Sequence, residues 1–377
     1  MNGRVAPRAD TETPTVHVPA RLGLPQGVLA ALPTPCLVAG RAAIDRNLAE
    51  ARRQANGVLL RPHLKAHKCS RLLREQLAAG PCAGATCATA HEAEVAVAAG
   101  VTDVLVANEV VDVEPLTALA DLAGRATVTV AVDSPVGLQR LEACAGAAGS
   151  TIGVLIDLDV GQHRCGLDPG DPQVLALARR AAASGALELR GLMGYEGHAQ
   201  HAPDADARER LARAVAATLT HAQARLREAG LDCPVLSGGG TGTLAAHGRL
   251  RALTEVQAGS YALMDQQYLE VGLPFEPAVW CLATVVSRRG ADAVLNAGWK
   301  ELAGEDGPPA VLLVGATVGD LSDEHANVRL AVGTPLAVGD RVLLAPRHLD
   351  PTLNLHPRIH VCNVGGAVEA WAIDARA

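Results

Sequence analysis

Hydrophobic positions follow a strand-like and a helix-like period in turn from about residue 33 onward. Short apolar or β-branched runs alternate with longer segments that repeat apolar residues at helical spacing, such as AIDRNLAEARRQA (43–55) and AHEAEVAVAAG (90–100). Several of the predicted helices end in glycine, as helix C-termini commonly do. The predicted strands are 36–40, 57–63, 84–89, 103–108, 127–133, 152–159, 189–195, 233–239 and 255–261.

This alternation of strands and helices indicates a parallel sheet with crossover helices. About eight such units fit a (β/α)8 TIM-like barrel better than an open doubly wound sheet, which would carry a G-x-G-x-x-G motif that the chain lacks. After Phe275 the pattern changes to alternating runs separated by Gly, Pro and Asp, with no room for crossover helices. We therefore expect a tail or arm over 1–30, a barrel over 31–272 and an antiparallel β domain over 273–377.

The composition narrows the class of protein. A hydrophobic fraction of 49% against 19% charged residues excludes global disorder. The net charge of −7, with no basic stretch of note beyond 61–68, argues against a nucleic-acid partner. The nine cysteines form no C-x-x-C pair, and the chain has neither an apolar signal region nor an apolar run of bilayer length. We expect no membrane partner and a reducing, cytoplasmic location.

Polar residues cluster after the predicted strands, where the active sites of such barrels lie. RPHLKAHK (61–68) follows the apolar run 58–60, and it allows either a lysine at the mouth of a pocket or a zinc site made by His63 and His67. The zinc site is the weaker hypothesis, because H-x-x-x-H brings both rings to one metal only on a helix. Between Lys65 and Lys68, period-2 alternation favours Lys65 as the inward-facing side chain by a small margin.

Two later segments are suited to bind a phosphate group. SGGGTGT (237–243) offers glycine amides and threonine hydroxyls to an anion, and the alternative is a tight turn without a ligand. QAGSY (257–261) follows the next strand, and the last two strand–helix loops of these barrels commonly bind phosphate. A lysine at an early strand end and a phosphate cradle at the last two suit pyridoxal phosphate.

A metal site is predicted in APRHLDPTLNL (345–355). On a strand, His348 and Asp350 would point to the same face, because strand side chains alternate. Imidazole and carboxylate together suit Mg²⁺, Mn²⁺ or Zn²⁺, and the alternative is a chance pair on the surface.

Taken in order, these segments resemble the D-threonine aldolase and D-serine dehydratase-like family, whose members share the alanine-racemase-type barrel of fold type III pyridoxal-phosphate enzymes. The resemblance covers roughly residues 33 to 356 and is closer to the D-threonine aldolase branch. The stretches that carry it are TPCLVAGRAAIDRN, RPHLKAHK, ATAHEAEVAVAAGVTDVLVANEVV, DLDVGQHRCGL, YEGHAQH, SGGGTGT, TEVQAGSYALMD, LSDEHA and RHLDPTLNL.

The resemblance implies roles for individual residues. Lys65 would be the Schiff-base lysine, Arg164 would face the ring nitrogen, and Tyr195 would lie beside the cofactor. His201 would act as the base at the substrate's β-hydroxyl, with His198 as the second candidate. The implied phosphate and cofactor contacts are Gly239, Gly240, Thr241, Gly259, Ser260 and Tyr261.

The implied function is a metal-dependent aldolase that cleaves D-β-hydroxy-α-amino acids to glycine and an aldehyde. The alternative is a dehydratase on D-serine or 3-hydroxyaspartate, which gives a 2-oxo acid and ammonia; a non-catalytic pyridoxal-phosphate carrier would resemble the barrel alone. Dehydratase-like members usually have H-x-C where this chain has His348 and Asp350, so the carboxylate favours the aldolase and Mn²⁺ or Mg²⁺ over Zn²⁺. A homodimer is also implied.

Overall fold

The computed structural model describes residues 13–376, so residues 1–12 of the predicted tail lie outside the described part. The rest of that segment contains β1 (Val16–His17), the short 3-10 helix η1 (Ala20–Leu22) and α1 (Gln26–Ala31). The chain forms two compact units. Within the described residues, one holds 42–278, 348–359 and 370–376, and the other holds 13–41, 279–347 and 360–369.

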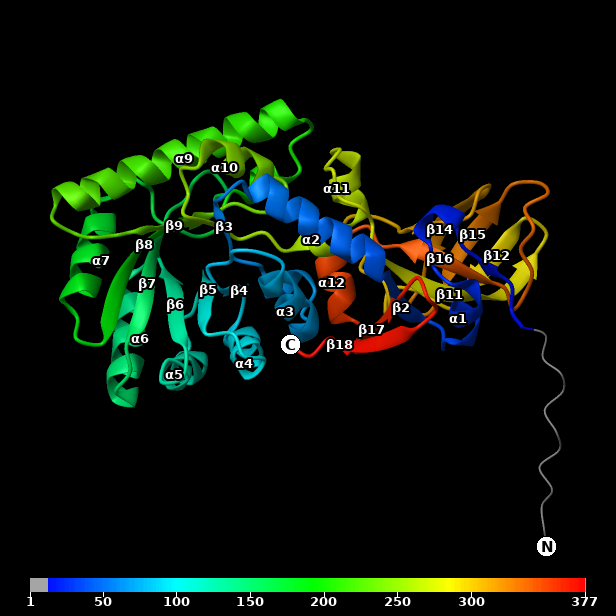
Figure 1. Ribbon diagram of the computed structural model, residues 1–377, viewed down its shortest axis with the longest axis horizontal. Helices are drawn as coiled ribbons and strands as arrows, with labels where there is room; N and C mark the ends of the chain where they lie inside the picture. Colours follow the sequence, from blue (N-terminus) through cyan, green and yellow to red (C-terminus); the bar gives the residue numbers. More distant parts are fainter. Residues whose placement is uncertain (1–12, 377) are drawn as a thin grey trace, which may run out of the picture. The chain divides into compact units, whose positions relative to one another are not determined.

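The first unit is built on an eight-stranded parallel sheet (Figure 1). Its strand order is β3-β10-β9-β8-β7-β6-β5-β4, and parallel bridges from Leu60 to Cys82 and from His63 to Thr86 connect the two ends of this order. The predicted (β/α)8 barrel is therefore confirmed. The strands are β3 (Leu59–Leu60), β4 (Ala85–Cys87), β5 (Asp103–Glu109), β6 (Thr127–Val132), β7 (Ile152–Asp157), β8 (Leu187–Gly194), β9 (Val235–Gly238) and β10 (Glu255–Val256).

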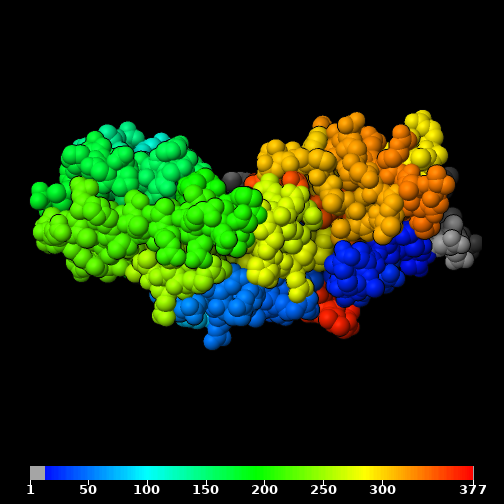
Figure 2. Space-filling view, turned by 90° about the horizontal axis from the view of Figure 1, so that it is seen from above, coloured from blue at the N-terminus to red at the C-terminus, as the bar shows by residue number. Residues whose placement is uncertain are grey.

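Helices cover the outside of this sheet, and several of them begin at a side-chain cap. Thr89 accepts a hydrogen bond from the amide of Glu92 at the start of α4, and Asp204 accepts one from Ala207 at the start of α9. Figure 2 is seen from the side on which α9 lies in Figure 1, and it shows this green segment at the surface. The helices are α2 (Arg41–Ala55), η2 (Leu64–Ala66), α3 (Ser70–Ala78), α4 (Ala90–Ala98), α5 (Val113–Leu122), α6 (Pro135–Ala148), α7 (Pro172–Ala183), α8 (Gly197–Gln200), α9 (Ala205–Glu228), α10 (Leu244–Leu250), η3 (Ser260–Ala262), α11 (Gln266–Glu270) and α12 (Leu349–Asn354).

Charged residues close the N-terminal end of the barrel. The buried Arg61 donates to Glu255, the first residue of β10, at 2.8 Å and to Asp103, the first residue of β5, at 2.7 Å. Above them, apolar side chains from neighbouring strands fill the interior, among them Leu105, Leu155 and Met193. The C-terminal ends of the strands are thus the open face on which a site can form.

The second unit contains an antiparallel sheet, as expected for the C-terminal part of the chain. Segment 36–40, which we predicted as a barrel strand, is instead β2 and pairs antiparallel with β11. All five of its residues are buried, so its sequence has no alternation to distinguish the two kinds of sheet. Besides β1, which pairs in parallel with β16, the strands are β2 (Cys36–Gly40), β11 (Val279–Arg289), β12 (Asp292–Leu295), β13 (Ala310–Val311), β14 (Ala316–Leu321), β15 (Ala326–Leu330), β16 (Arg341–Ala345), β17 (Arg358–Cys362) and β18 (Val368–Ala372).

Trp280, Val38 and Leu343 belong to the apolar core of this second unit. Across residues 13–376, no helix is both long and apolar enough to cross a membrane.

Candidate active site

One cavity of about 310 Å³ lies at the C-terminal ends of the barrel strands. This volume falls within the usual range for small-molecule sites, which begins at about 300 Å³. Most of the lining residues are of polar or charged types, and they come from segments that are far apart in the sequence. The lining residues are His63, Lys65, Ala66, Gln162, Arg164, Tyr195, Gly197, His201, Gly240, Thr241, Gln257, Gly259, Ser260, Asp265, Tyr268, His348 and Asp350.

The two candidate lysines have different surroundings. Lys65 lies in η2, directly after β3, and its Nζ is 5.7 Å from the centre of the Tyr195 ring in the cavity. Lys68 does not line the cavity, and its Nζ forms an ion pair with the Glu92 carboxylate at 2.7 Å. The Glu92 side chain is fully buried and also accepts a bond from the amide of Ala88 at 2.6 Å. Lys65 is thus the lysine that can react with a ligand in the cavity.

The histidines of the same segment also differ. The Nε2 of His67 is 2.8 Å from the side-chain oxygen of Gln76, and its Nδ1 accepts a hydrogen bond from the amide of Cys69. These two bonds leave neither ring nitrogen of His67 for a zinc ion. Burial lowers the pKa of His67 to about 4 and lowers that of His63 well below its usual value, so both rings are neutral at pH 7.

Arg164 and Tyr195 stand close together at the cavity. The loop that carries Arg164 is held by Asp159, which accepts hydrogen bonds from the amides of Gly161 and His163 at 2.9 and 3.0 Å. The guanidinium carbon of Arg164 is 5.8 Å from the centre of the Tyr195 ring. Burial, with the nearby carboxylate of Glu196, raises the pKa of Tyr195 to about 12, so the phenol keeps its proton at neutral pH.

The two glycine-bearing loops contribute unequally to the cavity. Gly240, Thr241, Gly259 and Ser260 line it, whereas Gly239 and Tyr261 do not. The amide of Gly239 donates to a carboxylate oxygen of Glu196 at 3.1 Å. Tyr261 is fully buried with its ring centre 6.0 Å from that of Phe275, and its amide donates to the Thr241 hydroxyl.

At Gly259 a Cβ atom would lie 2.6 Å from the carbonyl oxygen of His63. Only glycine therefore allows this close approach of the loop to the segment that carries Lys65.

Of the two candidate bases, only His201 lines the cavity. Its ring stacks on Tyr268, with the ring centres 4.4 Å apart. His198 is exposed, and its amide donates to the side chain of Gln162 at 2.7 Å. Tyr268, Gln162, Gln257 and Asp265 are lining residues that we did not predict. Gln162 and Gln257 lie in the quoted stretches DLDVGQHRCGL and QAGSY, and Asp265 ends TEVQAGSYALMD, but no short motif marks Tyr268.

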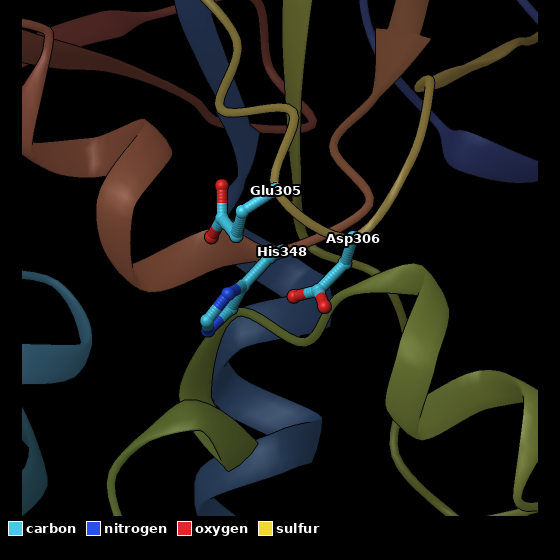
Figure 3. Close-up of side chains that lie close together, drawn as sticks. All are labelled: Glu305, Asp306 and His348. Carbon is cyan, nitrogen blue, oxygen red and sulfur yellow. The ribbon is translucent and has the colours of Figure 1, made fainter.

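The predicted metal pair lines the cavity, but it does not stand on a strand. His348 is the N-cap of α12, and Asp350 lies in the first turn of that helix (Figure 3 shows the His348 side chain). A carboxylate oxygen of Asp350 is 3.4 Å from the Ser260 hydroxyl. The intervening amide, that of Leu349, donates to Asp265 at 3.2 Å. The same-face argument from strand geometry was therefore wrong, although both side chains reach the same cavity.

The carboxyl of Asp157, at the end of β7, is protonated at neutral pH. Asp157 ends β7 and is buried, and burial together with the nearby carboxylate of Glu109 raises its pKa to about 9. Asp157 therefore adds no negative charge beside Arg164 at pH 7.

These features define an alanine-racemase-type barrel protein: a parallel barrel whose early lysine and two late glycine-bearing loops line one cavity. The model of the family described as "Alanine racemase, N-terminal domain" matches residues 40–267, and the model described as "Putative serine dehydratase domain" matches residues 278–362.

Comparison with known proteins narrows the family to which the chain belongs. It is 39% identical to a D-threonine aldolase from an Arthrobacter species, over 95% of this chain and 96% of the relative. A crystal structure of D-threonine aldolase from Filomicrobium marinum superposes with a TM-score of 0.87 at 38% identity, covering 91% of this chain and 95% of that one. The D-threo-3-hydroxyaspartate dehydratase of Delftia sp. HT23 gives 0.84 at 30% identity, covering 92% and 98%. The chain belongs to the D-threonine aldolase and D-serine dehydratase-like family, which confirms the resemblance.

Proposed function

We propose that this protein is a metal-dependent pyridoxal-phosphate aldolase that cleaves D-threonine-like β-hydroxy amino acids to glycine and an aldehyde. The observation that carries the proposal is the lining of the cavity, where Lys65, the loop residues Thr241 and Ser260, and the pair His348 and Asp350 meet. A carrier protein would need no metal pair in the cavity. The aldolase names of similar proteins, including a 3-hydroxy-D-aspartate aldolase of Paracoccus denitrificans at 32% identity, support the same reaction class.

The cavity fits pyridoxal phosphate, and membership of the family supports it as the cofactor. Thr241, Gly259 and Ser260 form a cradle for the phosphate, and a Cβ at Gly259 would collide with the backbone of the lysine segment. When bound, the cofactor supplies an aldehyde carbon that bonds to an amine and a ring that accepts an electron pair. Lys65 is the residue whose amine would hold that aldehyde. Arg164 is a permanent cation that we place at the ring nitrogen, where it opposes protonation.

His348 and Asp350 would hold the divalent ion. Imidazole with a carboxylate suits Mn²⁺ or Mg²⁺, and Zn²⁺ is the third candidate. Such an ion supplies a Lewis acid that makes a substrate hydroxyl more acidic. For a related protein, a D-threo-3-hydroxyaspartate dehydratase, one solved mutant structure is in a metal-free form.

His201 is the base that we assign to the β-hydroxyl proton of the substrate. Both side chains are exposed, but His201 lines the cavity and His198 does not, which favours His201. The stack on Tyr268 fixes the plane of the ring, so that one nitrogen keeps a constant direction toward the substrate. Loss of the hydroxyl proton and of the Cα–Cβ bond then gives the aldehyde, and protonation at Cα gives glycine.

Matched variants of two lining residues test the proposal. We expect Lys65→Met to lose the visible absorbance of the bound cofactor, and Asp350→Ala to keep that absorbance while losing metal-stimulated aldehyde formation from D-threonine. Aldehyde formation that is unchanged in Asp350→Ala would refute the metal pair. An absorbance that is unchanged in Lys65→Met would refute the cofactor site.

We further propose that the barrel part of the chain (31–272) binds the cofactor and that the part over 273–377 supplies the metal pair. The family resemblance and the cysteine pattern support two more proposals, a homodimer and a cytoplasmic location. Light scattering coupled to size-exclusion chromatography tests the dimer, with a monomer mass as the contradicting result.

A further inference from the structure

A fully buried, hydrogen-bonded pair of side chains, Glu196 and His247, adjoins the glycine-rich loop 237–243. Glu196 follows β8 and His247 lies on α10, and neither side chain is exposed to solvent. The Nε2 of His247 and the hydroxyl of Thr243 are 2.7 and 2.8 Å from one carboxylate oxygen of Glu196. The other carboxylate oxygen accepts the amide of Gly239 at 3.1 Å. Three donors thus converge on a carboxylate with no access to water.

The geometry fixes which groups donate. Burial alone disfavours a charged Glu196, but its interactions with His247 and the hydrogen bond from Thr243 outweigh burial and lower the pKa of the carboxyl. Nδ1 of His247 is buried and has no hydrogen-bond partner within residues 13–376. A proton on that nitrogen would be a buried, unsatisfied donor, so a single proton at Nε2 is the arrangement that the site satisfies.

The side chain of Gln200 connects the same loop to segment 195–201, which contains Tyr195 and His201. Gln200 accepts the amide of Gly242 at 2.9 Å and donates to the Thr243 hydroxyl at 3.2 Å. A Cβ at Gly242 would lie 2.1 Å from the backbone oxygen of Gln200, so the two segments are in closest contact here. Gln200 directly precedes His201, and Glu196 directly follows Tyr195, so both bonded side chains adjoin residues that line the cavity.

We propose that Glu196 and His247 are positioning residues for the phosphate end of the cofactor. They hold the glycine-rich loop against the segment 195–201, in the conformation in which Gly240 and Thr241 line the cavity. Neither residue lines the cavity itself, so both act through the loop. The inference rests on the proposed function, because it assumes that this loop receives the phosphate of pyridoxal phosphate.

The test compares two ligands that differ only in the phosphate. Pyridoxal and pyridoxal phosphate share the aldehyde and the ring, so a displaced phosphate loop weakens binding of the phosphorylated form selectively. A general loss of structure weakens both alike. The measurement is the equilibrium binding of each ligand to the apoprotein, followed by the absorbance of the bound aldehyde, and the readout is the ratio of the two affinities.

Two substitutions of His247 test whether its hydrogen bond to Glu196 is what matters. In His247→Gln, the amide nitrogen can occupy the position of Nε2 and still donate to Glu196, so we expect a ratio close to that of the wild type. In His247→Asn, the shorter amide reaches only the position of Nδ1, and we expect the ratio to fall about tenfold or more, the scale of one lost hydrogen bond to a charged group. The control is Gln223→Leu, which removes a buried 2.7 Å bond to the Cys233 carbonyl away from the cavity and leaves the ratio unchanged.

If His247→Asn does not fold, Glu196→Gln takes its place. This change keeps the shape of the side chain, but its new NH₂ group can face the amide N–H of Gly239, so that two donors oppose each other. We therefore expect the same selective loss. Equal weakening of both ligands in the variant that folds, or no weakening of either, overturns the inference. Failure of the wild-type protein to bind pyridoxal phosphate would instead overturn the proposed function.

Discussion

Lys65 and Lys68 are three residues apart, and the structure predicts opposite consequences for the same substitution at each. In Lys68→Met, the Glu92 carboxylate loses its ion partner while its side chain stays completely buried. Removing one member of a buried pair destabilises a protein by about 3–5 kcal/mol. The Lys68 side chain is 14% exposed, so water can reach the gap, and we expect a loss in the free energy of unfolding near the lower end, about 3 kcal/mol.

In Lys65→Met, a side chain that lines a cavity is replaced without leaving a buried charge behind. We expect the free energy of unfolding to change by less than about 1 kcal/mol, and the covalent link to the cofactor to be lost. Urea titrations of both variants without cofactor give the stability difference, because bound ligand would otherwise add its own stabilisation. Borohydride reduction of the holoprotein followed by peptide mass analysis identifies the linked lysine.

Two results would refute this reasoning. One is an unchanged urea midpoint for Lys68→Met, which would mean that the pair with Glu92 contributes nothing measurable. The other is a covalent label that survives Lys65→Met but disappears in Lys68→Met, which would reverse the assignment.

Three further predictions concern the cavity and a strand end. His201→Ala should lower kcat by about 10²–10⁴-fold, the usual contribution of a general base, while His198→Ala should leave kcat nearly unchanged; similar losses in both would contradict the assignment. Asp350→Ala should reduce the bound metal measured by elemental analysis, and full retention would argue against the site. Burial raises the pKa of Asp157 from 3.8 to about 9, so the native state holds an extra proton in that window and stability falls as pH rises through it. Asp157→Asn should reduce that decline in urea titrations, and an unchanged slope would show that the carboxyl is ionised in the fold.

The sequence predicted those parts of the site that depend on the repeated strand–helix units of the barrel. Parallel strands place their C-terminal ends at one face, so residues after successive strands could be expected to meet even when they are far apart in the chain. Lys65, Thr241 and Ser260 were found in this way. Short segments without a repeat were harder, since HLD is too short to show a period. Pro351 fits the first turn of a helix, so the pair at 348 and 350 begins α12 instead of lying on a strand.

The residues that sequence reasoning missed are defined by contacts between distant segments. Glu196 and His247 are 51 positions apart, and nothing near either residue indicates the other. The two residues meet because the fold brings the end of β8 close to α10, and the sequence alone does not show this. Tyr268 was missed for the same reason, because it stacks on His201, a residue of another segment of the cavity lining.

The central claim is that the protein cleaves the Cα–Cβ bond of a D-β-hydroxy amino acid in a reaction that requires a metal ion. The most direct test is the product balance from D-threonine with the purified protein, pyridoxal phosphate and Mn²⁺. We predict acetaldehyde and glycine in equal amounts, with both lost on adding a chelator and restored by excess Mn²⁺. Formation of 2-oxobutanoate and ammonia would contradict the claim and show that the protein is a dehydratase.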